Sequence, residues 1–282
     1  MAENRYHIHV DAEKQSLALN FREIWAYRDL IWLFTKRTFK LIYKQTVLGP
    51  LWIVMSPLFT SIVYTIIFGR IAGLSTGGTP KLLFYLCSHA LWSFFSASLS
   101  QNASAFIANA HVYRKVYFPR LTIPISNTIS CAFQMLIQMS MVIVLVIWYG
   151  LKGVLVPHLQ YLPVLVPTIL CIGALSFGLG TLVSSLTTKY RDLGFLVGFG
   201  LQLWMYLSPV IYPVAQVSQP VLRRFLLINP MTAPMEIFRF VLLGSGTVEP
   251  LSVISTVFFS IAALLTGVAV FRKAERTFVD TI

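Results

Sequence analysis

Acidic residues are scarce in this chain, and long parts of it contain no charged residue at all. The 282 residues include only 10 Asp and Glu against 22 Lys and Arg, and charged residues make up 11% of the sequence. Lys, Arg, Asp and Glu are absent from the six stretches 45–69, 82–113, 121–151, 153–188, 193–222 and 250–271. A soluble chain of this length could not bury so much apolar surface in one core, so the deficit excludes an ordinary soluble protein.

Three other absences exclude further functions. The sequence has no Gly-x-x-x-x-Gly-Lys-Ser/Thr motif, so the chain cannot cradle ATP phosphates on a P-loop of its own. The predicted spans carry no carboxylate and one histidine, His89, so an ion-coupled carrier is not expected, and His89 is expected to hydrogen-bond between helices. Cys87, Cys131 and Cys171 fall inside predicted spans without ligand spacing, so we expect packing residues and neither disulfides nor a metal site.

The uncharged stretches are long enough for one membrane span each. A helix needs about 20 mainly apolar residues to cross the hydrocarbon layer. The mean hydropathy of +0.73 and the 56% of hydrophobic residues agree with a membrane protein. We therefore predict an all-α integral membrane protein with six transmembrane helices, at about 50–70, 82–108, 122–149, 162–186, 193–212 and 250–271.

Positive charge is distributed unevenly around these spans. Sixteen of the 22 Lys and Arg residues precede the first span or follow the second, fourth or sixth. The other side receives only Arg70, Lys81, Lys152, Arg223, Arg224 and Arg239. Because Lys and Arg accumulate on cytoplasmic loops, both termini are expected in the cytoplasm. The net charge of +12 then reflects topology and anionic lipid headgroups, and no nucleic-acid partner is expected.

Residues 20–46 have the pattern of an amphipathic helix that follows an N-terminal tail at 1–19 and precedes the membrane domain at 47–282. Asn20 and Glu23 resemble a capping box, and apolar residues form a stripe opposite the charged face. We expect this helix to lie in the membrane interface, contacting membrane lipids through Trp25, Arg28, Asp29, Lys36, Arg37 and Lys40. A soluble helix packed on another domain is the alternative, but the sequence holds no other soluble segment for it.

Two short basic loops follow the second and fourth spans. Residues 109–121 read Asn-Ala-His-Val-Tyr-Arg-Lys-Val-Tyr-Phe-Pro-Arg-Leu and can form two turns of helix. In the second loop, Asp192 beside Arg191 can form a local ion pair or cap the next helix. Composition alone favours solvated turns for both loops.

Small residues recur in the predicted fourth and fifth spans, where they are expected to permit close helix packing. They are Gly173, Ser176, Gly178 and Gly180 in the fourth span and Gly194, Gly198 and Gly200 in the fifth. The pair Gly194 and Gly198 has the GxxxG spacing, which is also common by chance.

Residues 213–246 fit neither a clean span nor a polar loop. Two short apolar pieces, 220–228 and 234–243, are separated by Asn229 and Pro230. We predict short re-entrant helices between spans five and six, because irregular backbone at membrane depth must be buried in protein or line a cavity. Glu236 and Arg239, at i and i+3, are expected to pair.

Several motifs are spread over the chain from about residue 20 onward. They are Arg28-Asp29-Leu30, Tyr43–Trp52 (Tyr-Lys-Gln-Thr-Val-Leu-Gly-Pro-Leu-Trp), Tyr113–Arg120 (Tyr-Arg-Lys-Val-Tyr-Phe-Pro-Arg), Tyr190-Arg191-Asp192, Leu207–Tyr212 (Leu-Ser-Pro-Val-Ile-Tyr) and Asn229-Pro230. Together they resemble the membrane subunits of type 2 ABC exporters, and more narrowly the bacterial exporters of O-antigen, capsule and teichoic acid. The block at Tyr43–Trp52 is the most specific of them.

The resemblance implies a permease subunit in a bacterial cytoplasmic (inner) membrane, acting as a homodimer with a separate ABC ATPase subunit that binds ATP and Mg²⁺. Residues 109–119 would contain the coupling helix that docks on the ATPase, and the loop at residue 190 would lie close by. The implied coupling residues are Tyr113, Arg114, Lys115, Tyr117, Phe118, Tyr190, Arg191 and Asp192. Tyr113, Tyr117 and Phe118 would provide buried anchors, and the basic residues would face acidic patches on the partner.

Aromatic residues are plentiful in the predicted second and fifth spans. Aromatic faces can stack on sugar C–H surfaces and tolerate different sugars, as they tolerate different bases in single-stranded nucleic acid. The residues expected to line a substrate path are Trp92, Phe95, Phe199, Trp204, Tyr206 and Tyr212. The alternative for each is an ordinary lipid-facing or interfacial aromatic residue. Six spans leave little room for a glycan, so the path is expected between two copies of the chain.

The resemblance also implies that the region 213–246 is the outer gate, with Asn229, Pro230, Glu236 and Arg239 as its residues. A plain structural plug is equally supported by the residues themselves. The predicted function is the permease half of an ATP-driven exporter of lipid-linked polysaccharide, with catalysis in the partner. A permease for a drug, lipid or other amphiphile is the alternative. From a different class, a membrane glycosyltransferase would need a conspicuous carboxylate pair for its donor and metal, but Glu236 and Glu249 are the only acidic residues expected on the outer side.

Overall fold

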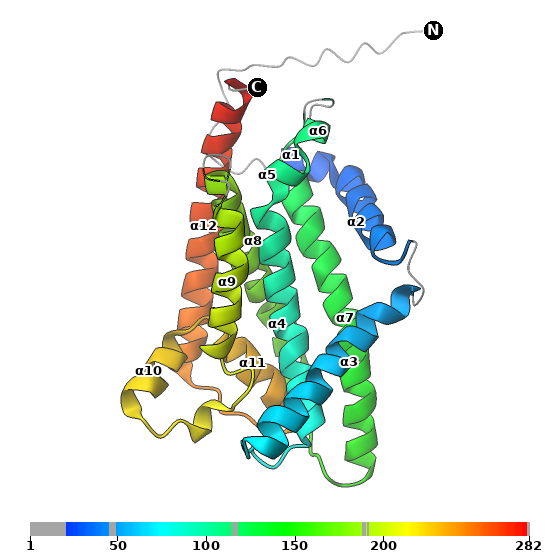
Figure 1. Cartoon of the computed structure of the whole chain (residues 1–282), viewed down its shortest axis with the longest axis vertical. Helices are drawn as coiled ribbons and strands as arrows, with labels where there is room; N and C mark the ends of the chain where they lie inside the picture. The colour runs from blue at the N-terminus through cyan, green and yellow to red at the C-terminus, as the bar shows by residue number, and fades with distance from the viewer. Residues whose placement is uncertain are drawn as a thin grey trace.

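The long helices of the chain run side by side along its long axis (Figure 1). The computed structural model describes residues 21–44, 49–113, 115, 118–187, 190 and 192–280, without the side chains of 21–23, 41–43, 50 and 276–280. Within these residues all regular structure is helical and no strand is present. Five helices there are long and apolar enough to cross a membrane, and a bent pair of helices would make six. The all-α class is thus confirmed, and the lengths of the apolar helices agree with a membrane protein.

Most predicted spans correspond to one helix. The long helical segments are α3 (Trp52–Tyr64) with η2 (Thr65–Ile71), α4 (Lys81–Ala103), α7 (Thr122–Leu151), η3 (Leu159–Val164) with α8 (Leu165–Thr187), and α12 (Pro250–Asp280). The helix α12 continues beyond the predicted end at residue 271, because its last turns carry charged residues that suit water and still favour helix.

Two predicted spans are shorter than expected. The prediction of 82–108 is wrong at its end, because α4 stops at Ala103 and the separate turns α5 (Ala105–Ala108) and α6 (Ala110–Tyr113) follow. The prediction of 193–212 is also too long, since α9 (Leu193–Tyr206) has 14 residues. Pro209 disfavours a helical Ser208, so the chain turns there. At 1.5 Å per residue, α9 is about 21 Å long, less than the hydrocarbon thickness.

The predicted amphipathic helix is present as two pieces, α1 (Phe21–Ala26) and α2 (Arg28–Tyr43), separated by a turn at Tyr27. Its apolar side packs on the protein through Ile24, Tyr27, Leu30 and Phe34. The residues predicted for the interface, Trp25, Arg28, Asp29, Lys36, Arg37 and Lys40, are all exposed. The expected cap residue Asn20 and the link at 45–48 lie outside the described residues.

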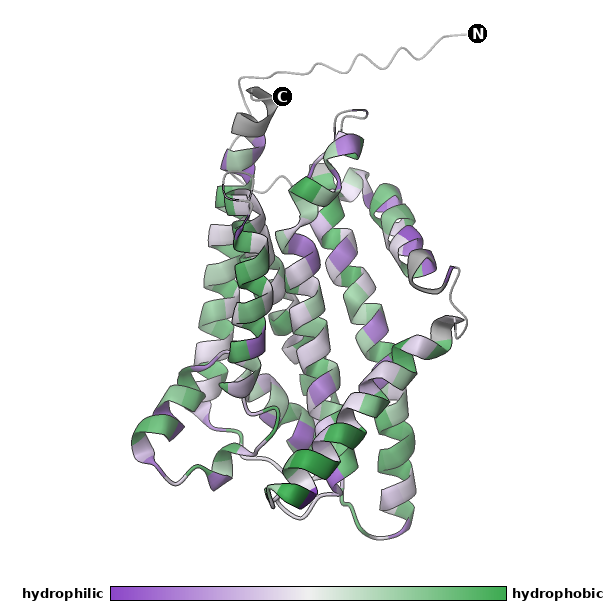
Figure 2. Ribbon diagram, viewed as in Figure 1, coloured by the Kyte–Doolittle hydropathy of each residue, from purple (hydrophilic) through white to green (hydrophobic). Residues whose placement is uncertain are grey.

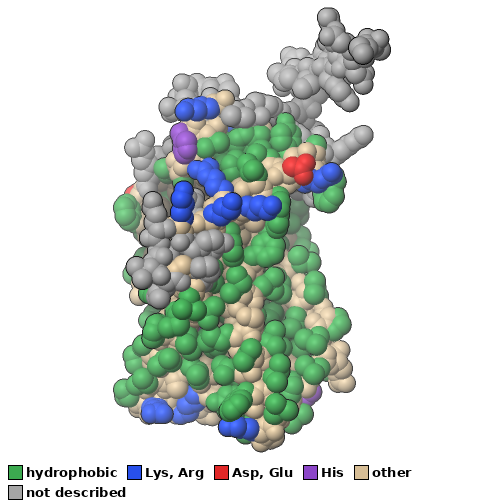
Figure 3. All heavy atoms as spheres, turned by 90° about the vertical axis from the view of Figure 1, so that its right-hand side faces the viewer, with side chains coloured by type: hydrophobic (Ala, Val, Ile, Leu, Met, Phe, Trp, Pro, Cys, Tyr) green, Lys and Arg blue, Asp and Glu red, His purple; other side chains and the backbone are tan. Residues whose placement is uncertain are grey.

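The molecule has two distinct ends. At the α6 end lie α1, α2, α5, α6 and the last turns of α12, and at the α10 end lie α10 (Pro220–Ile228) and α11 (Thr232–Phe238) (Figure 1). Hydrophobic residues dominate the helices between the two ends (Figure 2). On the face that carries α2, Lys and Arg form a band near the α6 end, and a broad hydrophobic surface separates them from a few at the α10 end (Figure 3).

The pair that follows α9 is bent sharply. Helix α10 and the continuous segment α11 with η5 (Arg239–Leu243) meet at 88° around Asn229 and Pro230, near the predicted interruption. Both pieces lie at the α10 end, where α9 stops and α12 starts (Figure 1). Gly244 ends η5 with φ of 65°, against the backbone of Val156, where a side chain would not fit.

Helix α4 is the centre of the bundle. Of the residues in its apolar stretch 72% are buried, compared with 22% in α3. Its buried residues belong to the main core, which also includes residues of α7, α8, α11 and η5. A second, aromatic core lies at the α6 end and joins α5, α6, α7, α8 and α12. The two cores hold opposite ends of the bundle, and each contains residues predicted to be functional.

Candidate functional site

At the α6 end, stacked and tilted aromatic rings connect four helices in a continuous row of contacts, in which Phe106 lies 6.0 Å from Tyr113. The Phe106 ring on α5 stacks on Phe271 of α12, with centroids 4.3 Å apart and planes 15° apart. The Tyr113 ring, at the end of α6, stacks on Phe118 at 5.6 Å, and Phe118 lies 5.8 Å from Phe34 of α2. Offset aromatic pairs of this kind contribute about 0.5–1.5 kcal/mol beyond their buried area. A movement of α5 or α6 would therefore be passed to α2 and α12.

Arg120 ties this stack to α12. Its Nη1 donates to the Glu275 carbonyl at 3.2 Å, and its Nε lies 3.8 Å from the Glu275 carboxylate. The Tyr113 hydroxyl donates to the Arg120 carbonyl at 3.3 Å. Burial raises the pKa of Tyr113, and nearby Glu275 raises it further, whereas Arg120 lowers it. Tyr113 therefore stays protonated and keeps this hydrogen bond at neutral pH.

The predicted coupling residues differ in exposure. Tyr113 and Phe118 are 9% and 5% exposed, so in this arrangement they anchor the loop to the chain itself and are not available to a partner's groove. Lys115, Tyr190 and Asp192 are exposed. Arg114, Tyr117 and Arg191 lie outside the described residues. Asp192 begins α9 through its backbone carbonyl, which accepts from the Phe195 N–H at 3.0 Å, and its side chain makes no capping hydrogen bond.

Sequence reasoning missed two exposed residues beside this loop, Ile107 and His111. Ile107 is 50% exposed on α5, although the predicted second span placed it inside the membrane. The signal that could have found it is the polar run 100–104, Ser-Gln-Asn-Ala-Ser. The Ser104 hydroxyl donates to the Ser100 and Gln101 carbonyls where α4 ends, and such side-chain bonds compete with continued helix.

The aromatic residues predicted for a substrate path fall into two groups. Trp92 and Phe95 are buried, and Phe95 contacts both Trp92 (5.4 Å) and Trp204 (5.0 Å) in the core between α4 and α9. Phe199 and Tyr206 are 62% and 49% exposed on α9. Tyr212 is half-buried and donates to the Tyr206 carbonyl at 3.2 Å. The chain therefore buries the first group in its core and leaves Phe199 and Tyr206 on its surface.

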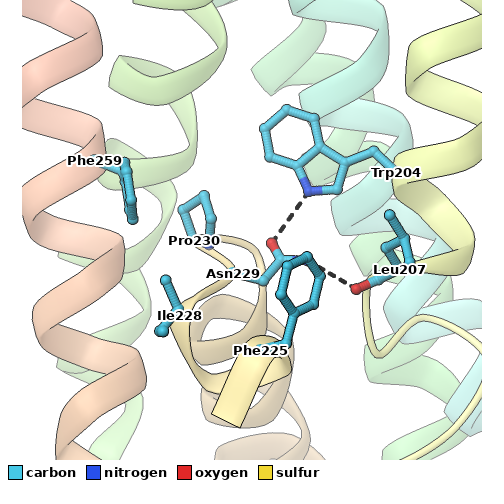
Figure 4. A pocket seen from close by; sticks show the side chains of 7 residues that line it. All are labelled: Trp204, Leu207, Phe225, Ile228, Asn229, Pro230 and Phe259. Atoms are coloured by element: carbon cyan, nitrogen blue, oxygen red, sulfur yellow. Dashed lines mark hydrogen bonds between the residues drawn. The ribbon is translucent and has the colours of Figure 1, made fainter. Parts of the chain in front are cut away.

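Trp204 and Asn229 face a pocket of about 230 Å³ between α9, α10 and α12, whose other lining residues are Leu207, Phe225, Ile228, Pro230 and Phe259 (Figure 4). The Asn229 amide is fully used by the protein. Its oxygen accepts from Trp204 Nε1 at 3.2 Å and from the Met231 N–H at 3.0 Å. Its nitrogen donates to the Leu207 carbonyl at 2.9 Å and to the Ser208 hydroxyl at 3.0 Å.

The bend at residues 229–230 is also fastened to α12. The Thr256 hydroxyl donates to the Pro230 carbonyl at 2.8 Å, and the Ser255 hydroxyl donates to the Leu227 carbonyl at 3.0 Å. These bonds satisfy carbonyls that the bend removes from helical pairing. Asn229 thus holds the bend to α9 while two hydroxyls hold it to α12.

Glu236 and Arg239 form the predicted i, i+3 ion pair, which the structure confirms. Arg239 Nη1 donates to Glu236 Oε1 at 2.9 Å, and each side chain is 1% exposed. The guanidinium also donates to the Ser88 hydroxyl on α4 and to the Pro209 and Val210 carbonyls after α9, and it lies 3.8 Å from the Phe84 ring centre. A buried charge pair is tolerated only with such additional hydrogen bonds.

The Glu236 carboxylate accepts two backbone N–H groups in addition to Arg239. They come from Val214, at 3.4 Å, and from Thr247, at 3.0 Å. The pair therefore joins α4, the segment after α9, and the loop that leads to α12. The residues predicted as an outer gate are placed together at the α10 end, and all are buried.

The π-helical turn η5 continues this arrangement. A π-turn leaves carbonyls without their usual partner, and such turns are frequent at functional sites. His158 takes up two of them, because its backbone N–H donates to the Val241 carbonyl at 2.9 Å and its Nδ1 lies 2.9 Å from the Phe240 carbonyl. The His158 ring also stacks on Phe240 at 4.5 Å. The loop before η3 therefore holds η5 in place.

The expected hydrogen bond of His89 is not formed. Its ring packs edge-on against Tyr64 at 6.1 Å, and Nδ1 has no partner among the described residues. Among all the residues that the structure describes, no group of three or more His, Cys, Asp and Glu is arranged to hold a metal ion. The charged and aromatic residues described above join helices to one another.

Comparison with known proteins gives a family match over most of the chain. Residues 29–243 match the sequence profile of a family described as ABC-2 type transporter. A Klebsiella pneumoniae protein named O-antigen export system permease protein RfbA is 26% identical over 258 residues, which cover 90% of this chain and 95% of that protein. A Myxococcus xanthus protein with the same name is 26% identical over 265 residues, covering 93% and 98%.

Proposed function

Because the chain belongs to the family of ABC-2 type transporters, we propose that it is the permease subunit of an ATP-driven exporter that moves a lipid-linked polysaccharide across a bacterial cytoplasmic membrane. The observation that carries the proposal is the similarity, along nearly the whole chain, to two permeases named for O-antigen export. The family membership also agrees with the resemblance drawn from the motif at Tyr43–Trp52.

In this proposal two copies of the chain act with two ATPase subunits, which bind ATP and Mg²⁺. The chain itself is not an enzyme, in keeping with the lack of a P-loop motif anywhere in its sequence. The α6 end faces the cytoplasm together with both termini, which agrees with the band of Lys and Arg at that end (Figure 3).

The proposed docking surface for the ATPase is the exposed side of the loop between α4 and α7, with Ile107, His111 and Lys115, and the nearby Tyr190. Movement of the ATPase would shift α5 and α6 together. The aromatic contacts of Phe106 with Phe271 and of Phe118 with Phe34 would then carry the shift into α12 and α2. Coupling of this kind requires packed, contiguous contacts with two arrangements.

The proposed substrate path lies between two copies, along the exposed aromatics Phe199 and Tyr206 of α9. The bent pair of α10 and α11 is proposed as a re-entrant element that closes the path at the outer side. The hydrogen bonds of Asn229 and Arg239 support this role, because they fix irregular backbone that could not survive in contact with lipid.

A copurification experiment tests the proposal. The tagged chain is purified from native membranes in mild detergent, and the proteins and lipid-linked glycans that accompany it are identified by mass spectrometry. The double substitution Ile107→Asp and Lys115→Glu should lower the copurified ATPase and its ATP hydrolysis about tenfold, equivalent to about 1.4 kcal/mol of binding free energy. The matched control Lys152→Glu reverses a charge at the opposite end and should change neither.

A deletion strain tests the cargo. Loss of the chain should remove polysaccharide from the cell surface and leave lipid-linked glycan inside the cell. A preparation without any ATPase would contradict the ABC assignment, whereas an ATPase that accompanies the chain in a strain with normal surface polysaccharide would contradict only the cargo.

A further inference from the structure

A groove runs beneath the N-terminal helices and continues into the bundle. It consists of two adjoining hollows, one of about 700 Å³ between α2 and α7 and one of about 460 Å³ between α7, α8 and α12. Ile24, Ile125 and Ile129 line both hollows, so the two adjoin one another along these three side chains. Spaces of this size are typical of sites for small amphiphilic molecules.

The inner hollow offers a ligand only hydrocarbon. Its walls are apolar residues such as Phe94, Leu170 and Leu264, and its one polar side chain is Thr128. The Thr128 hydroxyl is already used, since it donates to the Pro124 carbonyl at 3.0 Å and accepts from Asn102 Nδ2 at 2.8 Å. A polar ligand would lose its water without gaining a partner there, so the hollow suits an acyl chain.

The outer hollow has a different character. It is lined by Trp25, Trp32 and Arg28, whose guanidinium lies 5.9 Å from the Trp25 ring centre. The helix α2 carries four basic residues, Arg28, Lys36, Arg37 and Lys40, against one acid, Asp29. All four basic residues are exposed, and Figure 3 shows Lys and Arg gathered near the α6 end on the face that carries α2. Tryptophan and basic residues together are characteristic of the headgroup level of a membrane, where they attract anionic lipids.

Hydrogen bonds hold α2 in a fixed position and so keep the groove open. The Thr35 side chain is 2% exposed, and its hydroxyl lies 3.5 Å from the Ser126 carbonyl of α7. In return, the Ser130 hydroxyl donates to the Thr35 carbonyl at 3.4 Å. The helix is thus anchored to α7 near its middle, while its N-terminal part and α1 cover the space. An apolar occupant would gain dispersion contacts with these walls and so stabilise this arrangement.

We propose that the groove binds one anionic phospholipid from the leaflet at the α6 end. One acyl chain occupies the hollow between α7 and α8, and the phosphate lies beside Arg28. The bound lipid then forms part of the contact between α2 and α7. This site is independent of the proposed export function, because it concerns a resident lipid and not the cargo.

The test is lipid retention by the full chain. The protein is reconstituted in bilayers with equal amounts of phosphatidylglycerol and phosphatidylcholine of the same acyl chains, extracted in mild detergent, and measured by native mass spectrometry. The wild type should retain one phosphatidylglycerol. Arg28→Gln should reduce its preference over phosphatidylcholine about fivefold, as expected for one basic residue beside an anionic headgroup.

Two filling variants test the inner hollow. Ile129→Trp and Ala174→Leu should each abolish retention of the lipid, and using both guards against one variant failing to fold. The control Lys152→Gln changes another cation that lies over a tryptophan, Trp148, at the α10 end, and should leave retention unchanged. Arg28 is exposed, so its substitution leaves folding intact.

Several results would overturn the proposal. One is equal retention of the two phospholipids by the wild type, which would indicate ordinary surrounding lipid. Another is unchanged retention in both filling variants. A third is lipid retention that appears only after deletion of residues 1–19, which would mean that this segment of the chain fills the groove itself.

Discussion

The consecutive helices α8 and α9 are both apolar and rich in glycine but have very different surroundings. Each carries three glycines and no charged residue. In α8, a side chain at Gly178 would overlap the Ala263 backbone of α12, and one at Gly180 would overlap Asn102 of α4. In α9, a side chain at Gly194, Gly198 or Gly200 would meet nothing within 4 Å. Gly178 and Gly180 are therefore required for packing inside the chain, whereas Gly173 and the glycines of α9 are not.

The same contrast separates the packed and exposed parts of the molecule. Helix α8 packs closely on both α4 and α12, and the Glu236–Arg239 pair is fastened to α4 at the α10 end. The faces of α3 and α9 remain largely open. The packed part is suited to moving as one unit, while the open faces are available to lipid or to a second copy. Packed interiors transmit displacement because they resist compression.

The largest expected effect concerns the two Glu–Arg pairs at the α10 end. Glu236→Ala leaves the buried Arg239 charge unpaired and should lower the free energy of unfolding by about 3–5 kcal/mol. Glu249→Ala breaks the Arg223 pair, in which the arginine side chain is 47% exposed. The expected loss there is about 0–1 kcal/mol. Denaturant unfolding of the purified chain in detergent measures both.

Equal losses in these two variants would contradict a structural role for the buried pair. The double variant Glu236→Ala with Arg239→Leu is a further check. It removes both charges and should recover part of the stability, because an apolar replacement of a buried pair avoids the unpaired charge.

A smaller effect distinguishes the glycines. Gly178→Val should lower the free energy of unfolding by about 1–3 kcal/mol, because the α8–α12 contact must open to admit the side chain. Gly198→Val should change it by less than about 0.5 kcal/mol, since the site is open. The measurement is thermal unfolding in detergent, at a protein concentration low enough to keep the chain monomeric. A loss of similar size in both variants would show that α9 is as tightly packed as α8.

The smallest effect on stability, and the most informative for function, is expected at exposed aromatics. Phe199→Ala on α9 and Phe258→Ala on α12 should each change the free energy of unfolding by less than about 0.5 kcal/mol, because both rings are on the surface. Export of polysaccharide to the cell surface should fall with Phe199→Ala only. Equal export by both variants would remove α9 from the proposed path.

Much of the helical arrangement could be predicted from local sequence. The lengths of the stretches without charged residues located the long helices. The Asn229-Pro230 interruption located the sharp bend, because proline and the residue before it disfavour helix. The errors occurred where uncharged residues were not membrane-spanning. Ile107 and most residues from 207 to 212 are apolar, yet Ile107 lies exposed on a short turn and residues 207–212 form no helix, and apolar character alone does not distinguish these environments.

The site residues were predictable in identity more than in placement. The Glu236–Arg239 pair followed from its i, i+3 spacing, but its contacts with Ser88 and with the segment after α9 join residues distant in the chain. Phe95 and Phe199 were assigned the same role because both are aromatic residues in apolar helices. One is in the core and the other on the surface, and only the packing of α4 against α9 separates them.

The order of the amino acids by itself determined that the chain is a helical membrane protein with a basic amphipathic helix before its first span, since charge and apolar length act locally. The tertiary structure alone decided which glycines lie in tight contacts, which aromatics remain open, and that Arg239 is fully satisfied. These depend on the relative positions of helices far apart in the chain, and close packing and hydrogen bonding are decided only at those contacts.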